Sequence, residues 1–394
     1  MSPAPPARRG VRPVVACVFG TRPEAIKMVP VVAALRREPR VRTRVIVTAQ
    51  HRDMLDDVLR VFRIRPDLDL DIMRPAQSLT EVTVRGFQGL EAAFRKLRPD
   101  LVLVHGDTTT TLVGSIAAFY QRIPVGHVEA GLRTYDLGRP YPEEMNRRLA
   151  DALAAMHFAP TATSRRALLS ERISAKSVFV TGNTVIDALL TVAGRPHSFS
   201  AAGGVARALK AAAGRRIVLV TAHRRESWGA PFAGICRALA RIASRGDAAV
   251  VYPVHPNPNV RRPAHAVLGR VRNVHLLPAL DYPDLVHLMK RAHLVLTDSG
   301  GLQEEAPSLG KPVLVMREVT ERPEAVRAGT ALVVGTREER IVRETARLLD
   351  DDRAYRAMAE RVNPYGDGRA AERTVQAILH RFGLRRTRPL DFTP

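Results

Sequence analysis

Short apolar runs alternate with longer amphipathic stretches along most of the chain. The apolar runs that we expect to form strands include Val14–Phe19, Val45–Val47, Leu101–Val104, Pro124–Val128, Val178–Val180, Ile217–Val220, Ala248–Val254, Val274–Leu277, Leu294–Leu296, Pro312–Val315 and Ala331–Val334. Between them lie helical patterns such as Asp53–Val61, Leu79–Leu97 and Pro142–Leu153. Continuous apolar strands separated by helices are typical of parallel sheets covered on both faces. The pattern therefore predicts the α/β class, with two Rossmann-like, doubly wound domains.

One stretch interrupts this alternation. Gly194–Arg216 is rich in glycine, alanine and serine and has no strand pattern, so we expect it to join a domain of residues 1–193 to a second domain of residues 194–366. Its ARALKAAA portion could also be the first helix of the second domain. Two such sheets would face a central cleft at the carboxyl ends of their strands, where ligands of open α/β sheets bind.

The composition narrows the class of protein. With 394 residues, 45% of them hydrophobic, the chain is long enough for two cores and too apolar to be disordered. No apolar run approaches the roughly 20 residues of a membrane helix, and the opening MSPAPPARRGVRP lacks the apolar stretch of a secretory signal. Cys17 and Cys236 are too few and too far apart for a disulfide framework. We expect a reduced, cytoplasmic protein that does not enter a membrane.

The formal net charge of +22 arises from 61 basic and 39 acidic residues. Taken alone, this charge would favour nucleic acid, an anionic surface or an anionic substrate as the partner. Only six of the basic residues are lysine and 55 are arginine, distributed throughout the chain. This bias is more typical of codon usage than of a binding stripe, so we expect no nucleic-acid partner.

The first candidate anion contact follows the first predicted strand, in the segment FGTRPEAIK. Gly20 permits a tight turn, Thr21 can cap a helix, and Pro23 suits the first helical turn. Arg22 and Lys27 would then lie near a helix N-terminus, where backbone N–H groups already favour an anion. A capped helix whose charges are merely solvated explains the same spacing.

Carboxylates follow three successive strand-to-helix transitions of the first half. Asp107 comes after the run LVLV, Glu129 interrupts a strand-like run, and a glutamate pair opens a helix after a proline. Asp107 could be only an N-cap, and the helix dipole favours one of Glu143 and Glu144 regardless of function. Parallel topology would nevertheless bring the three positions to one rim. Clustered carboxylates raise one another's pKa there and can divide acid and base roles.

Polar residues of a different kind follow strands in the second half. The segment TAHRRESWG places His223 and Arg224 where they suit a phosphate or a proton transfer. His255 follows another predicted strand, and packing or capping explains it as well. Arg322, in a charged loop that opens a helix, is another possible anion contact.

The segment TDSGGLQEEAPSLGKP is a candidate nucleotide contact. Ser299 and Gly300 enter a helix whose exposed N–H groups suit a phosphate, and a glutamate one turn along, Glu304 or Glu305, could accept hydrogen bonds from ribose hydroxyls. Two cofactor motifs are missing from the sequence. The segment is not a Walker A loop, and the spacing around Glu129 is not the H-E-x-x-H of a zinc site.

Together these segments describe carboxylates on one wall of a cleft and anion and diol contacts on the other, which fits a nucleoside diphosphate bearing a group for acid/base chemistry. The motifs, in chain order, are FGTRPEAIKM, QHRDML, HGDTTTT, GHVEAGLRT, PEEMNRR, TGNTVIDAL, TAHRRESWG, VYPVHPNP, TDSGGLQEEAPSLGKPVLVMR and TERPEA. From about Val14 to Gly335 the chain resembles the non-hydrolysing UDP-N-acetylglucosamine 2-epimerases. The resemblance implies the glycosyltransferase-B fold, in which a C-terminal helix, here around Arg369–Arg381 within residues 367–394, crosses back onto the first domain.

The resemblance also implies a reaction: reversible C2 epimerisation of UDP-N-acetylglucosamine to UDP-N-acetylmannosamine, by elimination of UDP to 2-acetamidoglucal and readdition. The residues that match the family's catalytic positions are Asp107, Glu129, Glu143 and His223. Those that match its nucleotide contacts are Arg22, Lys27, Ser299, Gly300, Glu305 and Arg322. Bacterial members commonly use UDP-N-acetylglucosamine as an activator, for which the candidate residues are Gln50, His51, Arg224 and His255. The family further implies a homodimer and a reaction that needs no metal or other cofactor.

The sequence leaves three other activities open. The chain could epimerise a related UDP-sugar, because the motifs bind the shared UDP and reacting centre. It could be a hydrolysing variant that releases N-acetylmannosamine and UDP. It could also be a glycosyltransferase of the same fold, although that reading does not explain the carboxylates of the first half. Which carboxylate acts on which face of the sugar, and whether the product enters a cell-surface polysaccharide, are not fixed by the sequence.

Overall fold

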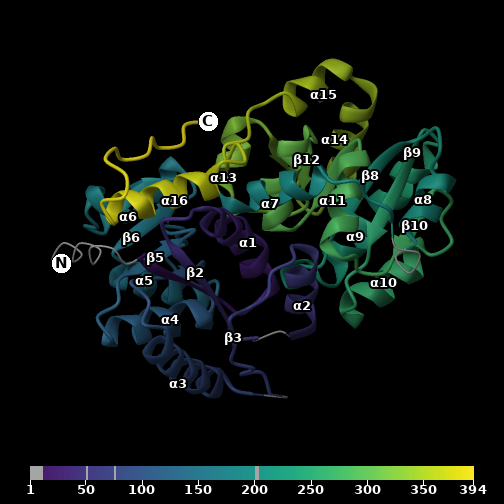
Figure 1. Cartoon of the computed structure of the whole chain (residues 1–394). Helices are drawn as coiled ribbons and strands as arrows, with labels where there is room; N and C mark the ends of the chain where they lie inside the picture. The colour runs from purple at the N-terminus through teal and green to yellow at the C-terminus, as the bar shows by residue number, and fades with distance from the viewer. Residues whose placement is uncertain (1–11, 50–51, 75–76, 200–203) are drawn as a thin grey trace. The chain divides into compact units, whose positions relative to one another are not determined.

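The computed structural model describes residues 12–49, 52–74, 77–199 and 204–394. The chain forms two compact units. The first unit comprises Met1–Ala188 and Gly366–Pro394, and the second comprises Leu189–Tyr365. Figure 1 labels many of the helices and strands of both.

The described part of the first unit contains a seven-stranded sheet with the order β3-β2-β1-β4-β5-β6-β7, whose neighbouring strands are all parallel. Its strands are β1 (Val14–Phe19), β2 (Arg42–Val47), β3 (Leu68–Asp69), β4 (Leu101–His105), β5 (Val125–Val128), β6 (Met156–Ala159) and β7 (Val178–Val180). Its helices are α1 (Arg22–Arg37), α2 (Arg52–Val61), α3 (Leu79–Leu97), α4 (Thr109–Tyr120), α5 (Glu143–Leu153), α6 (Ala162–Ser170), η1 (Ala175–Ser177), the first half of α7 (Thr184–Ala193) and α16 (Ala370–Arg381).

The described part of the second unit contains a six-stranded parallel sheet with the order β10-β9-β8-β11-β12-β13. Its strands are β8 (Arg216–Thr221), β9 (Ala248–Pro253), β10 (Val274–Leu277), β11 (Leu294–Thr297), β12 (Val313–Val315) and β13 (Ala331–Val333). Its helices are α8 (Val205–Ala211), η2 (Arg225–Ser227), α9 (Ala230–Ser244), α10 (Pro258–Leu268), α11 (Tyr282–Arg291), α12 (Gly300–Glu305), η3 (Ala306–Leu309), α13 (Pro323–Ala328), α14 (Glu338–Asp350) and α15 (Asp352–Ala359).

Helices cover both faces of the first unit's sheet. The helices α3, α4 and α5 pack in succession on one face, and α1, α2 and α16 pack together on the other (Figure 1). The strands are buried on both sides, as in β4, where all five residues are buried. Full burial explains why apolar, largely β-branched runs identified these strands in the sequence.

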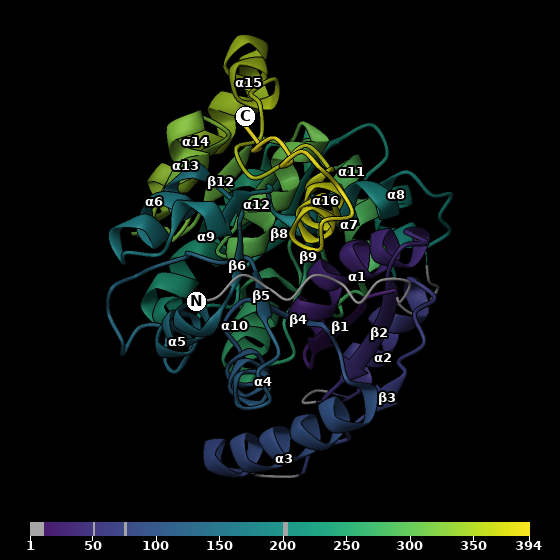
Figure 2. The same ribbon diagram turned by 60° about the vertical axis from the view of Figure 1, so that its left-hand side comes forward.

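The last helix packs against the first one, although they are far apart in the sequence. The two views place α16 beside α1 (Figure 1 and Figure 2). Asp187 caps α16 by accepting hydrogen bonds from the backbone N–H groups of Ala370 and Ala371, at 3.2 and 2.8 Å. Beyond the helix, the N–H of Phe392 donates to the carbonyl oxygen of Val180 on β7. The C-terminal segment therefore completes the first unit.

Each sheet reverses its strand order once. In the first unit the chain runs outward from β1 to β3 and then returns to β4, so β1 and β4 are neighbours from which the chain continues in opposite directions across the sheet. In the second unit β8 and β11 have the same relationship. Ligands of open α/β sheets bind at such reversal points, so the loops after β1, β4, β8 and β11 are where chemistry is expected.

Of the strands in the described residues, the apolar pattern located all but two. All the predicted runs contain a strand, with ends that differ by up to three residues. β3 was missed because it has only two residues, and β6, with the sequence MHFA, because it has no β-branched residue. The segment Gly194–Arg216 contains α8, so its ARALKAAA portion is helical.

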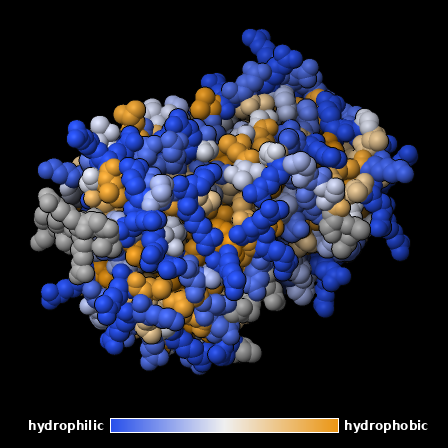
Figure 3. Space-filling view, in the orientation of Figure 1, coloured by the Kyte–Doolittle hydropathy of each residue, from blue (hydrophilic) through white to orange (hydrophobic). Residues whose placement is uncertain are grey.

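The exposed face is mostly polar. Hydrophilic residues cover most of the face in Figure 3, and apolar residues are exposed between them in small groups. Among the helices of the described ranges, none combines the length and apolar character needed to cross a bilayer.

Substitution of Gly131 would show how tightly the loop after β5 is packed. Its φ is +84°, and an added Cβ would lie 2.4 Å from the carbonyl oxygen of Ser164. Gly383, in the same unit, has a φ of +70° but open space around it. We expect Gly383→Ala to lower the free energy of unfolding by about 1 to 2 kcal/mol through backbone strain alone, and Gly131→Ala by about 2 to 5 kcal/mol. Urea denaturation followed by circular dichroism measures both; equal losses would contradict the close packing.

Candidate active site

The β1–α1 loop and the β4–α4 loop are joined by a buried glutamate. Glu24 accepts hydrogen bonds from the backbone N–H groups of Gly20 and Thr21, at 3.0 and 2.8 Å, and from the hydroxyl of Thr108 at 2.7 Å. Burial raises the pKa of Glu24, although these hydrogen bonds oppose the rise. Thr108 is the N-cap of α4 and follows Asp107 directly. Glu24 therefore fixes the start of α1 relative to the loop that carries Asp107.

Glu129 is the acidic residue at the end of β5, and three polar side chains face it. Lys27, from α1, forms an ion pair with its Oε2. The amide of Asn183, which follows β7, donates to the same oxygen at 2.9 Å. His105, at the end of β4, places its Nε2 3.9 Å away. Burial lowers the pKa of His105 to about 3, so this imidazole is neutral at physiological pH.

The backbone at Glu129 is unusual. Its φ is +66°, in the left-handed region that costs a side-chain-bearing residue free energy. The N–H of the next residue, Ala130, donates to the carbonyl oxygen of Phe158 on β6, and the N–H of Gly131 donates to Asp151. These contacts hold Glu129 in a conformation that aims its carboxylate at Lys27.

Asp107 is held from α5. The guanidinium of Arg147 lies 2.7 Å from its Oδ2, and the amide of Asn146 donates to its backbone carbonyl oxygen at 2.9 Å. Burial raises the pKa of Asp107; Arg147 opposes the rise, while the negative charges of Glu129 and Glu143 add to it. Its side chain remains 28% exposed. Asp107 is therefore a partly accessible carboxyl group with an increased affinity for a proton.

The two glutamates at the start of α5 differ in their surroundings. Glu144 is fully buried, and its two oxygens accept from the backbone N–H groups of Thr134 and Tyr135, each at 3.0 Å. Glu143 is partly exposed and lies close enough to Asp107 to raise its pKa. Glu144 is thus the structural member of the pair, and Glu143 is the member near the other carboxylates.

Arg22 is the first residue of α1 and is partly exposed. The backbone N–H groups before it, of Gly20 and Thr21, already donate to Glu24. The start of α1 is therefore capped by Glu24, and Lys27 pairs its charge with Glu129 rather than with solvent.

In the second unit, Asp298 organises the loop after β8. This residue follows β11, is fully buried, and accepts hydrogen bonds at its Oδ2 from the backbone N–H groups of His223 and Arg224, at 2.6 and 2.7 Å. Its Oδ1 lies 3.4 Å from the ring Nδ1 of His223. Burial lowers the pKa of His223, Asp298 opposes this, and the charge of Arg224 adds to it. The imidazole of His223 is consequently directed by a buried carboxylate.

Two guanidinium groups approach the start of α12. A Cβ added to Gly300 would lie 3.7 Å from Nη2 of Arg322 and 3.9 Å from Nη2 of Arg224. Arg322 also forms an ion pair with buried Glu304. Ser299 is the N-cap residue of α12, and its N–H donates to the Thr297 hydroxyl at 2.9 Å. Cations from two loops therefore meet at a backbone segment without a side chain, an arrangement suited to a phosphate.

Glu305 is buried one turn into α12, and the Tyr282 hydroxyl donates to it at 2.7 Å. His255 is exposed after β9 and stacks on His223 with ring centroids 5.4 Å apart. Arg224 and His255 thus adjoin His223, whereas Gln50 and His51, the other two candidates for an activator site, lie outside the described residues.

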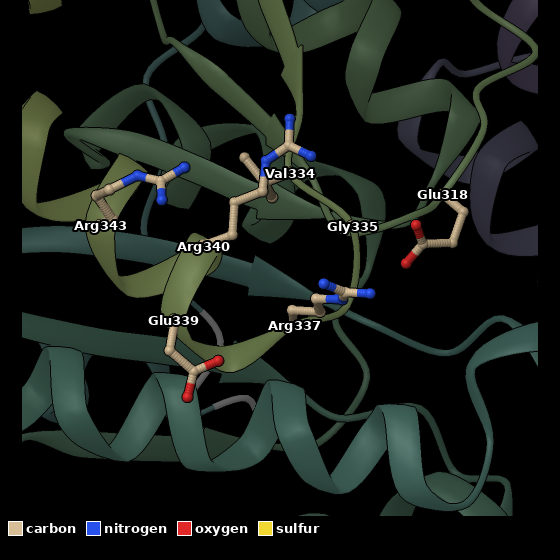
Figure 4. Close-up of a pocket in the computed structure, with 7 residues that line it drawn as sticks. All are labelled: Glu318, Val334, Gly335, Arg337, Glu339, Arg340 and Arg343. Carbon is tan, nitrogen blue, oxygen red and sulfur yellow. The ribbon is translucent and has the colours of Figure 1, made fainter.

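A cavity of about 350 Å³ in the second unit contains none of these residues. Figure 4 shows Glu318, Arg337, Arg340 and Arg343 among its lining residues, near the end of β13. Glu318 accepts hydrogen bonds there from the N–H and hydroxyl of Thr336, each at 3.2 Å. Within the ranges that the structure describes, no group of three or more histidine, cysteine, aspartate or glutamate side chains is arranged to hold a metal ion.

Several partners of the candidate residues were not selected from the sequence. Arg147 lies four residues after Glu143, a spacing that places both on one face of a helix, but 55 arginines gave no reason to choose it. Asn183 and Asp298 each follow a buried strand, and this signal, which identified Asp107, would have found them.

Comparison with known proteins gives the family. The family model described as UDP-N-acetylglucosamine 2-epimerase matches residues 33–379. The chain is 57% identical to the UDP-N-acetylglucosamine 2-epimerase of Escherichia coli K12 over 368 residues, which cover 92% of this chain and 97% of that one. The chain belongs to the UDP-N-acetylglucosamine 2-epimerase family.

Solved structures agree. The UDP-GlcNAc 2-epimerase of Neisseria meningitidis, bound to UDP-GlcNAc, is 48% identical with a TM-score of 0.84, covering 93% of this chain and 99% of that one. The S. aureus MnaA–UDP structure is 45% identical with a TM-score of 0.87, covering 97% and 100%. The predicted α/β class and the glycosyltransferase-B type of fold are confirmed.

The glutamate pair yields a prediction about stability. In Glu144→Gln one buried backbone N–H would face an amide NH₂ instead of an acceptor, so we expect the free energy of unfolding to fall by about 1 to 3 kcal/mol. Glu143→Gln, at a partly exposed site, should change it by about 0.5 kcal/mol or less. Urea denaturation of the two variants measures both changes. A larger loss of unfolding free energy in Glu143→Gln than in Glu144→Gln would contradict the assignment of Glu144 as the structural member of the pair.

Proposed function

We propose that the chain catalyses the reversible epimerisation of UDP-N-acetylglucosamine at C2 to give UDP-N-acetylmannosamine. The observation that carries this proposal is the group formed by Asp107, Glu129 and Lys27 at the carboxyl end of the first unit's sheet. The chain is an enzyme of a family whose relatives are named for this substrate, and the solved N. meningitidis relative holds UDP-GlcNAc.

The proposed reaction has two halves. A carboxylate removes the C2 proton while the bond between C1 and the UDP oxygen breaks, which forms the C1–C2 double bond of 2-acetamidoglucal and releases UDP. In the second half UDP adds back to C1 while a carboxyl group returns a proton to the other face of C2. We assign these transfers to Asp107, Glu129 and Glu143. The raised pKa of Asp107 supports this assignment, because a proton donor must hold its proton near working pH.

Stabilisation of the leaving group is the other requirement. The C2 hydrogen is not next to a carbonyl, so its acidity depends on charge that develops as the C1–O bond breaks, and cations aimed at the departing diphosphate lower the barrier. We assign this role to Arg224 and Arg322 beside Gly300, with Ser299 and His223 contacting the nucleotide. Glu305 is proposed to bind the ribose hydroxyls, and Arg22 to contact the nucleotide from the first unit.

Three finer proposals accompany this reaction. A second UDP-N-acetylglucosamine acts as an activator at a site that includes Arg224, His255, Gln50 and His51. The enzyme is a cytoplasmic homodimer that needs no cofactor. Its product supplies a cell-surface polysaccharide. Kinetics with sigmoidal dependence on substrate, and sedimentation at the dimer mass, test the first two.

Incubation with UDP-N-acetylglucosamine in D₂O, followed by NMR, tests the reaction itself. We expect deuterium at C2 and the appearance of the manno epimer with no acceptor present and with EDTA added. Free N-acetylmannosamine as the main product would indicate a hydrolysing variant instead. A C2 position that exchanges no hydrogen would exclude both activities.

Substitution of the carboxylates tests the site. Asp107→Asn, Glu129→Gln and Glu143→Gln should each lower kcat by about 100- to 10,000-fold, because each removes a group that transfers a proton. Affinity for UDP, measured by calorimetry, should change far less. Asp136→Asn, at an exposed carboxylate between Glu129 and Glu143 in the chain, is the control that should retain full activity. Near-normal turnover in all three site variants would show that the assignment is wrong.

A further inference from the structure

His127 lies at the centre of β5 and has no assigned role. The side chain is fully buried. Its Nδ1 lies 2.6 Å from Oδ1 of Asp151, and its Nε2 lies 2.7 Å from the backbone carbonyl oxygen of Gly106. Both ring nitrogens are therefore engaged, one with a carboxylate and one with the peptide group that precedes Asp107.

The partners fix the protonation state of this ring. The Gly106 carbonyl oxygen only accepts, so Nε2 carries a hydrogen. Asp151 also accepts from Arg133 at 2.7 Å and from the N–H of Gly131 at 3.2 Å, so it is an ionised carboxylate and Nδ1 must donate to it as well. His127 is consequently an imidazolium cation.

The surrounding charges agree with this state. Burial opposes a charged ring, but the charge and hydrogen bond of Asp151 outweigh it and raise the pKa of His127. The pKa of Asp151 is lowered to about 2; burial opposes the change, and His127 and Arg133 bring it about. The other titratable groups that act on this pair are His105 on β4 and His157 on β6, and Glu171 pairs with Arg133.

The pair joins the segments that carry the proposed acid/base residues. Through Gly106, His127 holds the turn that contains Asp107. Through Gly131, Asp151 holds the loop that contains Glu129, whose φ of +66° needs such support. Asp151 itself lies on α5, the helix that begins at Glu143. One buried ion pair therefore contacts all three elements.

We propose that His127, kept doubly protonated by Asp151, is a positioning residue that holds Asp107 and Glu129 in the geometry required for proton transfer at C2. This inference rests on the proposed function and deepens it, because it names what orients the acid/base pair. His127 touches neither substrate nor leaving group. Its loss should therefore slow proton transfer and leave nucleotide binding unchanged.

His127→Gln keeps a donor for Gly106 and removes the charge. We expect kcat to fall roughly 10- to 100-fold, as for a displacement of catalytic groups by about 1 Å, with KM and UDP affinity nearly unchanged. A larger share of turnovers should end in free 2-acetamidoglucal and UDP, because the second proton transfer is slowed. His157→Gln is the matched control: His157 is also buried, on the neighbouring strand, and its ring nitrogens contact the backbone carbonyl oxygen of Asp151 and the Ser177 hydroxyl rather than a carboxylate. Equal losses of kcat in the two variants, or a wild-type kcat in His127→Gln, would overturn the proposal.

A second measurement needs neither a variant nor activity. Neutron diffraction from deuterium-exchanged wild-type crystals at about pH 7.5, where an ordinary histidine is mostly neutral, should show deuterium on both ring nitrogens of His127. Density on only one nitrogen would refute the proposed state even if the enzyme is an epimerase. A wild-type protein that leaves UDP-N-acetylglucosamine unchanged would instead refute the proposed function, and the neutron result would still decide the state of the ring.

Discussion

In both units, carboxylates that are buried away from water need partners that replace their lost hydration. A buried charge costs several kcal/mol unless partners replace its hydration. At the first sheet, Glu129 is matched by Lys27 and Asn183. At the second sheet, Asp298 is matched by two backbone N–H groups. Because these partners come from other segments than the carboxylate, satisfying each carboxylate also fixes its own segment relative to theirs.

The carboxylates that hold loops in place differ in their hydrogen-bond partners from the carboxylates that we propose to transfer protons. Both oxygens of Glu24 and of Glu144 accept hydrogen bonds from the protein, from two backbone N–H groups in each case and also from threonine hydroxyls at Glu24, so these carboxylates hold loops in place. Asp107 is bound by a side chain on one oxygen and keeps 28% of its surface exposed. The pKa of Asp107 is raised while that of Asp151 is lowered to about 2. Acid/base chemistry requires carboxyl groups whose pKa values are shifted in opposite directions, and the first unit contains both kinds of environment.

The fold was largely predictable from the sequence, since strands buried on both faces must be apolar along their whole length. Exceptions follow the same reasoning: β2 begins three residues before its apolar run, at Arg42, because its first residue is exposed and the next two are only partly buried. The carboxylates of the candidate site were recognisable because they break an apolar pattern at strand ends. Their partners were not. Arg147 and His127 acquire their roles only from contacts across the fold, at Asp107 and Gly106, and no local pattern encodes such contacts.

Burial also explains how a chain with a net charge of +22 obtains specific cations. Arg60 is 77% exposed, so its charge is hydrated and screened by salt at about 10 Å. Arg133 is 2% exposed and lies between Asp151 and Glu171. The field of such a residue acts on its neighbours at low effective dielectric, where a charge has a larger effect. A few desolvated cations therefore determine the ionisation of the carboxylates in the first unit. The number of arginines on the surface does not.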